Sequence, residues 1–259
     1  MVRKHSVLDM GSGNGRRIRR RLVSAALAHV LPSHLASEVA LELGFSLRRA
    51  LYSRTTRLRL ARLDGCRVNV GCGYRPTPGW VNIELKSTAE TYFWDCRRHL
   101  PFSDARVTAI YCEHVFEHFH PDTEATFFLR ECLRCLRSGG VLRIVVPDAG
   151  AYLHAYSQSW EQLAALSSLE RTREGWRETR YNYKGLNNVY RTHMQLINEV
   201  FRQGDQHKYA YDEETLLLVL REAGFSNVIR QNFGSSLDRE MAPDNEARKT
   251  ESLYVEGVK

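Results

Sequence analysis

The chain has 259 residues, of which 43% are hydrophobic and 26% are charged, and its formal net charge at pH 7 is +7. This composition excludes a wholly disordered chain, and no apolar run is long enough to predict a membrane-spanning helix. The six scattered cysteines are too few for a disulfide scaffold and no secretory signal is evident, so we expect a cytoplasmic protein.

The positive charge is concentrated in the first quarter of the chain. Residues 1–62 contain 13 Lys and Arg against 3 Asp and Glu, a net charge of +10, whereas residues 63–259 carry −3. Apolar stretches at 22–31, 35–51 and 55–63 predict a basic helical extension over 1–62. Two interpretations stay open: residues 16–62 contact an anionic membrane or, less favoured, nucleic acid, or they pack on the body or a partner, including a homo-oligomer.

Strands alternate with helices from residue 65 onward. Short apolar runs predict strands at 66–70, 80–85, 91–95, 107–112 and 141–146, and the four-residue spacing of apolar side chains predicts a helix at 125–136 that Gly139 and Gly140 end. A helix at 213–223 and an antiparallel edge pair at 227–232 and 253–258 complete the pattern. We therefore expect an α/β fold, a Rossmann-like and mostly parallel sheet with helices on both faces. Residues 149–212 interrupt the alternation after a central strand, which predicts a substrate lid.

Two glycine loops compete as a nucleotide-binding turn. The first is Val7 to Gly15 and the second is Val68 to Tyr74. Only the second is followed by a strand that ends in an acid, Glu84, which is placed to accept hydrogen bonds from ribose hydroxyls. Asp95 ends the next predicted strand, where it would meet an adenine amino group. These strand-end acids favour the second loop.

Several motifs of the body resemble those of one enzyme family. They are Asn69 to Gly73, Gly79 to Glu84, Glu113 to His118, Leu136 to Gly140, Val145 to Asp148, His207 to Leu216, Arg221 to Phe225 and Ser252 to Glu256. Together they resemble the class I S-adenosylmethionine-dependent methyltransferases, most closely the type 11 bacterial subgroup. The resemblance spans about residues 65–259 and implies S-adenosylmethionine as cofactor and S-adenosylhomocysteine as product. The cofactor-binding residues expected from it and from the strand ends are Asn69, Val70, Gly71, Cys72, Gly73, Glu84, Asp95, Cys96, Glu113 and His114.

The crossover after the glycine loop is short. Only 13 positions separate Gly71 from Glu84, and Pro76 and Pro78 lie between them. This segment therefore has no room for a full helix, unlike many methyltransferases, although the type 11 subgroup shares the short form.

The expected reaction is O-methylation of a hydroxyl on a sugar, glycan or natural product. Methyl transfer to a hydroxyl needs alignment of the two reactants and an acceptor for one proton. Two alternatives are kept: a nucleic-acid methyltransferase steered by the basic extension, and a non-catalytic scaffold that binds S-adenosylmethionine. The acceptor class follows from the resemblance and from the polar, aromatic character of the predicted lid.

The chemistry-bearing residues gather after the fourth predicted strand. We expect His118, Glu117 and His207 to be catalytic, with a histidine as general base and Glu117 as its acidic partner. A second reading is a divalent metal such as Mg²⁺ held by His114, Glu117, His118 and Asp148, because the resemblance includes O-methyltransferases with a similar metal-holding cluster. A third is that these side chains cap a helix and close over the cofactor. The expected substrate-contacting residues are Asp148, Tyr183, Arg191, His193 and Asn198. Cys132 and Cys135 are spaced like half a zinc site but lie in a predicted helix, so we expect them to pack.

Overall fold

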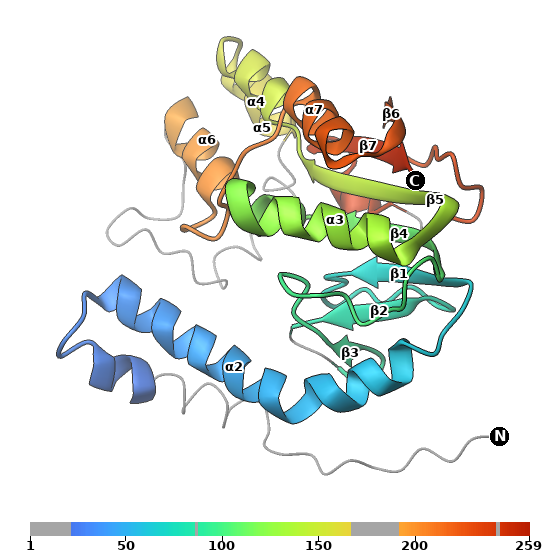
Figure 1. Cartoon of the computed structure of the whole chain (residues 1–259). Helices are drawn as coiled ribbons and strands as arrows, with labels where there is room; N and C mark the ends of the chain where they lie inside the picture. Colours follow the sequence, from blue (N-terminus) through green and yellow to red (C-terminus); the bar gives the residue numbers. More distant parts are fainter. Residues whose placement is uncertain (1–21, 86–87, 167–191, 242–243) are drawn as a thin grey trace. The chain divides into compact units, whose positions relative to one another are not determined.

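A computed structural model describes residues 22–85, 88–166, 192–241 and 244–259 (Figure 1). The chain divides into two compact units, residues 1–55 and 56–259. In the first unit a short helix at 22–27 is followed, after Pro32, by the long helix α2 (Ser33–Leu60), which continues into the second unit. The sequence predicted two helices in place of α2; no proline lies within this range and its single glycine, Gly44, is tolerated, so one helix forms.

The second unit is built on a seven-stranded sheet in the order β3-β2-β1-β4-β5-β7-β6. The first five strands pair in parallel, and β7 is antiparallel to both β5 and β6, which confirms the predicted mostly parallel sheet with an antiparallel edge. The strands are β1 (Cys66–Val70), β2 (Val81–Glu84), β3 (Tyr92–Phe93), β4 (Val107–Glu113), β5 (Leu136–Pro147), β6 (Ser226–Gln231) and β7 (Ser252–Val258). No helix lies between β1 and β2, as the short crossover predicted.

One face of the sheet supplies most of the hydrophobic core. Alternate residues along the central strands are buried there, in keeping with the two-residue period of a strand. They pack with buried side chains of α3 (Thr126–Cys135) and α7 (Glu213–Ala223). These two helices lie side by side across the sheet in Figure 1. Cys132 and Cys135 belong to this core, so the expectation that they pack is met.

Helix α3 ends earlier than the sequence predicted. The helix predicted at 125–136 stops at Cys135, and β5 begins at Leu136, five residues before the strand predicted at 141–146. Leu136 already pairs with Val107 of β4, and the register of the two strands shifts before Ala109. Gly139, at φ +75°, lies in the bulged stretch that this shift creates. The glycines therefore shape a bulge and do not end a helix.

The opposite face of β4, β5 and β7 is covered by residues 232–241 and 244–245, which we call the covering segment, whereas the sequence predicted helices on both faces. The hydrophobic side chains on this face pack against Phe233 and Met241. At its centre lies Arg143, only 1% exposed. Its guanidinium donates to Asp244 at 2.6 Å and 2.9 Å and to Glu256 at 2.9 Å, and also to two backbone carbonyls of the covering segment. A buried ionic cluster thus fastens this segment to the sheet.

Replacing Arg143 by methionine is expected to lower the free energy of unfolding by about 3–5 kcal/mol, because two buried carboxylates lose their cation. The matched control is Arg230→Met. Arg230 also pairs with two acids, Asp148 and Glu213, but its side chain is half exposed, so we expect a change of about 1 kcal/mol or less. Urea denaturation at neutral pH compares the two variants. Equal losses would mean that the buried cluster does not stabilise the fold.

The described residues of the predicted lid form three helices after β5. Its described helices are α4 (Ala149–Tyr156), α5 (Trp160–Leu166) and α6 (His193–Arg202). Tyr152, Ala155, Leu163, Leu196 and Ile197 form a hydrophobic cluster of their own. Thr192 and Gln195 form a capping box that begins α6. No helix among the described residues is long and apolar enough to cross a membrane.

Candidate active site

The strand ends that carry the predicted cofactor-binding residues lie at one edge of the sheet. Because β1, β2, β3, β4 and β5 run in parallel, their carboxyl ends share this edge, and the chain reverses its strand order between β1 and β4. Open α/β sheets bind ligands at such a switch point. The glycine loop follows β1, Glu84 ends β2, Glu113 ends β4 and Asp148 follows β5.

Gly71 is required at its position for two reasons. Its φ is +64°, in the left-handed region that favours glycine. In addition, a Cβ on this residue would lie 2.2 Å from Cγ2 of Val115, in the turn after β4. At Gly73, which has φ +55°, a Cβ would meet nothing within 4 Å. The loop is therefore packed against the β4 turn at Gly71 and bordered by open space at Gly73.

Hydrogen bonds fix the glycine loop. One carboxylate oxygen of Glu84 accepts from the backbone N–H of Gly73 at 2.9 Å, which joins the end of β2 to the loop. Asn69 donates to the Thr77 hydroxyl at 3.0 Å, and Asn82 exchanges hydrogen bonds with the backbone of Thr77. Val70 is fully buried. These contacts hold the crossover in place without a helix.

The residues after β3 are already engaged within the chain. Asp95 is buried and its carboxylate accepts two hydrogen bonds from the Arg97 guanidinium, each of 2.9 Å. Cys72 and Cys96 are buried as well, and burial raises the pKa of both thiols, that of Cys72 to about 11. Neither thiol is therefore a nucleophile at neutral pH. Asp95 remains a predicted adenine partner, now with an arginine beside it.

Glu113 and His114 connect β4 to the segment that precedes β7. Glu113 accepts from the backbone N–H of Asn245 at 3.1 Å. The two ring nitrogens of His114 lie 2.7 Å from the Arg248 guanidinium and 2.9 Å from the Ser252 hydroxyl. His114 also has φ +50°, a left-handed conformation rarely found outside glycine. Their role as cofactor contacts stays a prediction, and the structure adds a role in fastening this segment.

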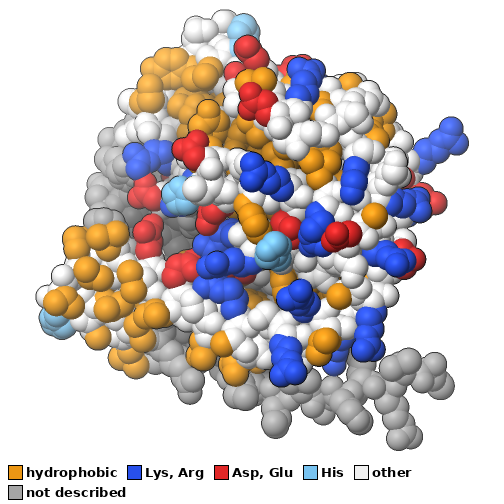
Figure 2. Space-filling model, viewed as in Figure 1, with side chains coloured by type: hydrophobic (Ala, Val, Ile, Leu, Met, Phe, Trp, Pro, Cys, Tyr) orange, Lys and Arg blue, Asp and Glu red, His pale blue; other side chains and the backbone are white. Residues whose placement is uncertain are grey.

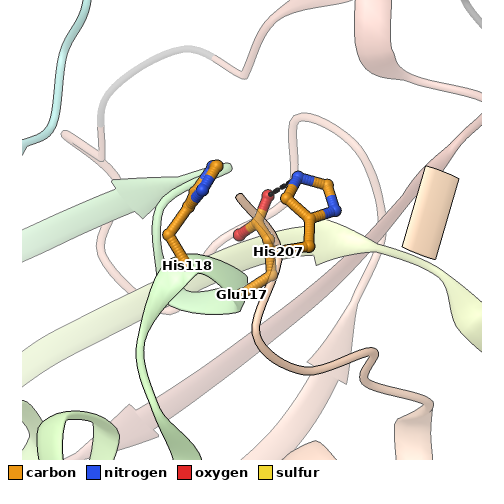
Figure 3. A group of neighbouring side chains, drawn as sticks. All are labelled: Glu117, His118 and His207. Atoms are coloured by element: carbon orange, nitrogen blue, oxygen red, sulfur yellow. Dashed lines mark ion pairs between the residues drawn. The ribbon is translucent and has the colours of Figure 1, made fainter. Parts of the chain in front are cut away.

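Glu117, His118 and His207 form one cluster (Figure 3). Each offers one ligand-type atom, and these atoms all lie within 4.8 Å of one another. Nε2 of His207 is 3.8 Å from Oε1 of Glu117, and the two imidazole rings stand edge to face with centroids 4.7 Å apart. These are the three residues that the sequence analysis named as catalytic, and they come together from positions 90 residues apart.

Two short segments hold the cluster. Glu117 and His118 lie in the 3-10 helix η1 (Phe116–His118), which follows the turn at His114 and is anchored by the fully buried Phe116. His207 lies where the chain returns from α6. There the backbone N–H of Lys208 donates to the Glu117 carbonyl at 2.8 Å. The end of the lid is thus hydrogen-bonded to the turn that carries Glu117.

Hydrogen bonds determine which nitrogen of each neutral imidazole carries the hydrogen. Nδ1 of His207 lies 2.7 Å from the carbonyl of Val200, and Nδ1 of His118 lies 3.1 Å from the carbonyl of Gln206. A carbonyl only accepts, so Nδ1 carries the hydrogen in both rings. In the neutral state Nε2 of each ring is consequently the proton acceptor.

Burial keeps Glu117 and His207 uncharged at neutral pH. Glu117 is 1% exposed and neither carboxylate oxygen has a hydrogen-bond partner among the described residues. Desolvation raises the pKa of Glu117 to about 8, and desolvation lowers the pKa of His207 to about 4. It also lowers the pKa of His114 well below the usual range. The arrangement can accept a proton on an imidazole and balance it with the carboxylate.

The predicted metal and substrate residues only partly join the cluster. The group that could hold an ion contains His207 in place of His114 and Asp148. Asp148 caps α4 by accepting from the backbone N–H of Ala151 at 2.9 Å. His193 and Asn198 lie on α6, each within hydrogen-bond distance of a backbone carbonyl. Tyr183 and Arg191 lie outside the described residues, as does the glycine motif at 7–15.

Arg248 is the residue that the sequence analysis missed. It ends the 3-10 helix η4 (Glu246–Arg248), and its guanidinium contacts His114, which in turn lies 3.4 Å from the Glu117 carboxylate. It places a positive charge beside the cluster. Nothing in the local sequence signals this, because the two residues are 134 positions apart.

A family model described as a methyltransferase domain matches residues 85–144. The matched segment contains β3, β4, α3 and the Glu117-His118 turn. This segment is therefore similar to methyltransferase domains. The match and the sheet order together confirm the class I S-adenosylmethionine-dependent methyltransferase fold that the sequence motifs implied. No curated protein matches the sequence significantly.

Solved methyltransferase structures resemble this domain distantly. A SAM-dependent methyltransferase from Archaeoglobus fulgidus is 13% identical, with a TM-score of 0.43 over 83% of this chain and 94% of that one. One from Thermotoga maritima is 16% identical, with a TM-score of 0.42 over 84% and 95%. The 1,6-didemethyltoxoflavin-N1-methyltransferase of Burkholderia thailandensis, solved with its substrate and S-adenosylhomocysteine, is 15% identical, with a TM-score of 0.41 over 98% and 93%. Likeness at this level assigns no residue a role.

Proposed function

We propose that this methyltransferase methylates a hydroxyl oxygen on a sugar, glycan or natural product. The observation that carries the proposal is the Glu117, His118 and His207 cluster at the carboxyl edge of the sheet. The cluster places imidazole Nε2 atoms, which can accept a proton, near a buried carboxyl group. A general base that removes a hydroxyl proton needs such an acceptor. Methylation of a neutral amine does not require such a base before the methyl group moves.

The glycine loop fits the cofactor. When bound, S-adenosylmethionine supplies an electrophilic methyl group on a sulfonium. The backbone at Gly73, bordered by open space, and the Glu84 carboxylate at the end of β2 would hold its nucleoside part. Gly71 allows the loop to turn against Val115 without a side chain in the way.

His118 acts as the general base in this proposal. The hydroxyl proton passes to its Nε2 while the new oxygen–carbon bond forms and the sulfur–carbon bond breaks. Glu117 then lies within 4.8 Å of the imidazolium and balances its charge when ionised. His207, hydrogen-bonded to α6, lies with its Nε2 3.8 Å from Oε1 of Glu117.

The same three side chains would also suit a divalent ion with nitrogen and oxygen ligands. Such an ion would polarise the acceptor hydroxyl and lower its pKa. The neighbouring Arg248 charge opposes a second cation at this position, which favours the metal-free form of the proposal.

A tyrosine two residues after His207 supports a sugar or planar acceptor. The backbone N–H of Tyr209 donates to the Glu117 carbonyl, its ring packs on that of Tyr211 with centroids 4.8 Å apart, and the residue is 39% exposed. A partly exposed tyrosine ring offers a stacking surface for such a molecule.

The test is transfer of a labelled methyl group from S-adenosylmethionine to a panel of hydroxylated acceptors, each paired with its O-blocked analogue. We expect label on a free hydroxyl and at least a hundredfold less on the blocked analogue. The reaction is run with and without chelator to separate the metal-free from the metal-assisted form. Label on nitrogen, or equal label on the blocked compound, would refute O-methylation while leaving methyltransferase activity intact.

A further inference from the structure

The long helix α2 presents an exposed row of large apolar side chains. Leu35, Val39, Leu43, Leu47 and Leu51 are 40%, 38%, 55%, 63% and 58% exposed. Leu22 and Val30, which precede α2, are 66% and 79% exposed. In Figure 2 hydrophobic side chains gather over the N-terminal helices. Scattered exposed leucines are ordinary, but a continuous row along one helix marks an interaction surface.

The row forms a broad face. Its members recur every four residues, and each such step advances about 40° around a helix of 3.6 residues per turn. The five residues therefore cover about 160° of the helix surface. Arg54 and Arg57 fall within this arc, whereas Glu38 and Glu42 fall outside it. We call this surface the α2 face, defined by the five apolar residues and these two arginines.

The charge around the α2 face is positive. Residues 43–62 contain six arginines and no acid, and residues 1–62 carry a net charge of +10. An arginine stem can lie along an apolar surface while its guanidinium reaches a polar layer. Leucines with arginines beside them are the composition of a helix that lies in a membrane interface.

We propose that the α2 face docks on an anionic lipid bilayer, with α2 lying in the plane of the headgroups. A second copy of the chain fits less well for two reasons. Helices that pair over a long distance need apolar residues every 3.5 positions on average, and this four-residue row drifts away from a straight partner. A second copy would also add its own arginine-rich half to an equally positive surface.

The experiment is co-sedimentation of the full chain with vesicles of phosphatidylcholine alone or with about one third phosphatidylglycerol. We expect binding only to the anionic vesicles, weakened at least tenfold when the salt concentration rises from 50 to 500 mM, since exposed charges are screened. The double variant Leu43→Ser, Leu47→Ser and the triple variant Arg54→Gln, Arg57→Gln, Arg59→Gln should each lose at least tenfold in affinity.

The control is Leu153→Ser, Leu218→Ser. These leucines lie on α4 and α7 and are 56% and 50% exposed, so they match the test pair in exposure but not in position. This variant should bind vesicles like the unchanged protein. Sedimentation velocity of each variant checks that it stays folded and reports its oligomeric state.

Three results would overturn the proposal: no binding to anionic vesicles, binding that both α2 variants keep, or a dimer that only the α2 variants abolish. The last would assign the α2 face to a second copy. None of these outcomes depends on methyl transfer, so the proposal stands or falls separately from the proposed function.

Discussion

Replacing Gly71 by alanine is expected to reduce affinity for S-adenosylhomocysteine at least a hundredfold. The alanine would have to keep φ near +64°, which costs about 1–2 kcal/mol, and its Cβ would overlap a methyl group of Val115. Relief of that overlap moves either the glycine loop or the β4 turn. Both belong to the edge where we place the cofactor, so titration calorimetry with S-adenosylhomocysteine reports the displacement directly.

Gly65 provides the matched control. Its φ is +65°, yet a Cβ there would meet nothing within 4 Å. Gly65→Ala should therefore show the backbone cost alone, a loss of about 1–2 kcal/mol in the free energy of unfolding, with unchanged affinity for the product. The comparison separates the effect of a left-handed backbone from that of the contact with Val115.

A second substitution tests the contact itself. Val115→Ala removes both methyl groups that a Cβ at Gly71 would touch, and leaves only the Val115 Cβ, at 3.3 Å. The double variant Gly71→Ala, Val115→Ala should recover part of the lost affinity. If Gly71→Ala binds S-adenosylhomocysteine normally, the cofactor does not depend on this loop, and the assignment of the glycine loop is wrong.

Local patterns were sufficient to predict the sheet. Apolar residues mark the position of each strand from β1 to β7, and that signal needs no knowledge of distant contacts. The position of Glu117 and His118 after β4 follows in the same way. Their proximity to His207 was not predicted, because no local rule brings together residues 89 and 90 positions apart.

The covering of the second sheet face could not be predicted. In the sequence, Arg143 is a single charged residue within an otherwise apolar strand. Its acceptors Asp244 and Glu256 are 101 and 113 residues away along the chain. The pattern of alternating elements suggested helices there. A buried arginine is stable only when its donors are satisfied. The covering segment satisfies them with two backbone carbonyls and Asp244, and β7 adds Glu256.

The end of α3 was misplaced for a related reason. Glycine is a common helix terminator, so the pair at 139–140 was the natural stop signal. Pairing of Leu136 with Val107 decides the matter instead, since β4 and β5 are joined from residue 136 onward. Strand pairing thus outweighed the local preference of glycine for helix ends. The two glycines instead lie in the bulged stretch of β5.

His118→Ala is expected to lower kcat by a factor of about 10² to 10⁴ while affinity for S-adenosylhomocysteine stays within threefold, because a general base acts on the acceptor proton and not on cofactor binding. His120→Ala is the control, since His120 is an exposed histidine two residues further along the chain. A His118→Ala enzyme with unchanged kcat would assign the cluster a structural role.

The pH dependence of the same enzyme distinguishes a base from a packing residue. Burial raises the pKa of Glu117 to about 8, so below that pH the carboxyl is protonated and cannot balance an imidazolium at His118. The rate of the unchanged enzyme should therefore rise between pH 6 and 9. Glu117→Gln should keep a low rate without this rise, whereas a merely structural Glu117 would leave the pH profile unchanged.

The pH dependence of the free energy of unfolding tests the raised pKa of Glu117 independently of catalysis. The pKa of Glu117 in the folded protein, about 8, is above its ordinary value of 4.5, so the folded state holds a proton that the unfolded state has released between these pH values. Stability should fall as the pH rises through this window, and Glu117→Gln should remove that contribution to the fall. Urea denaturation at pH 5 and pH 8 measures the difference. If both proteins lose equal stability, Glu117 titrates normally in the fold, and the carboxylate is already ionised when the acceptor binds.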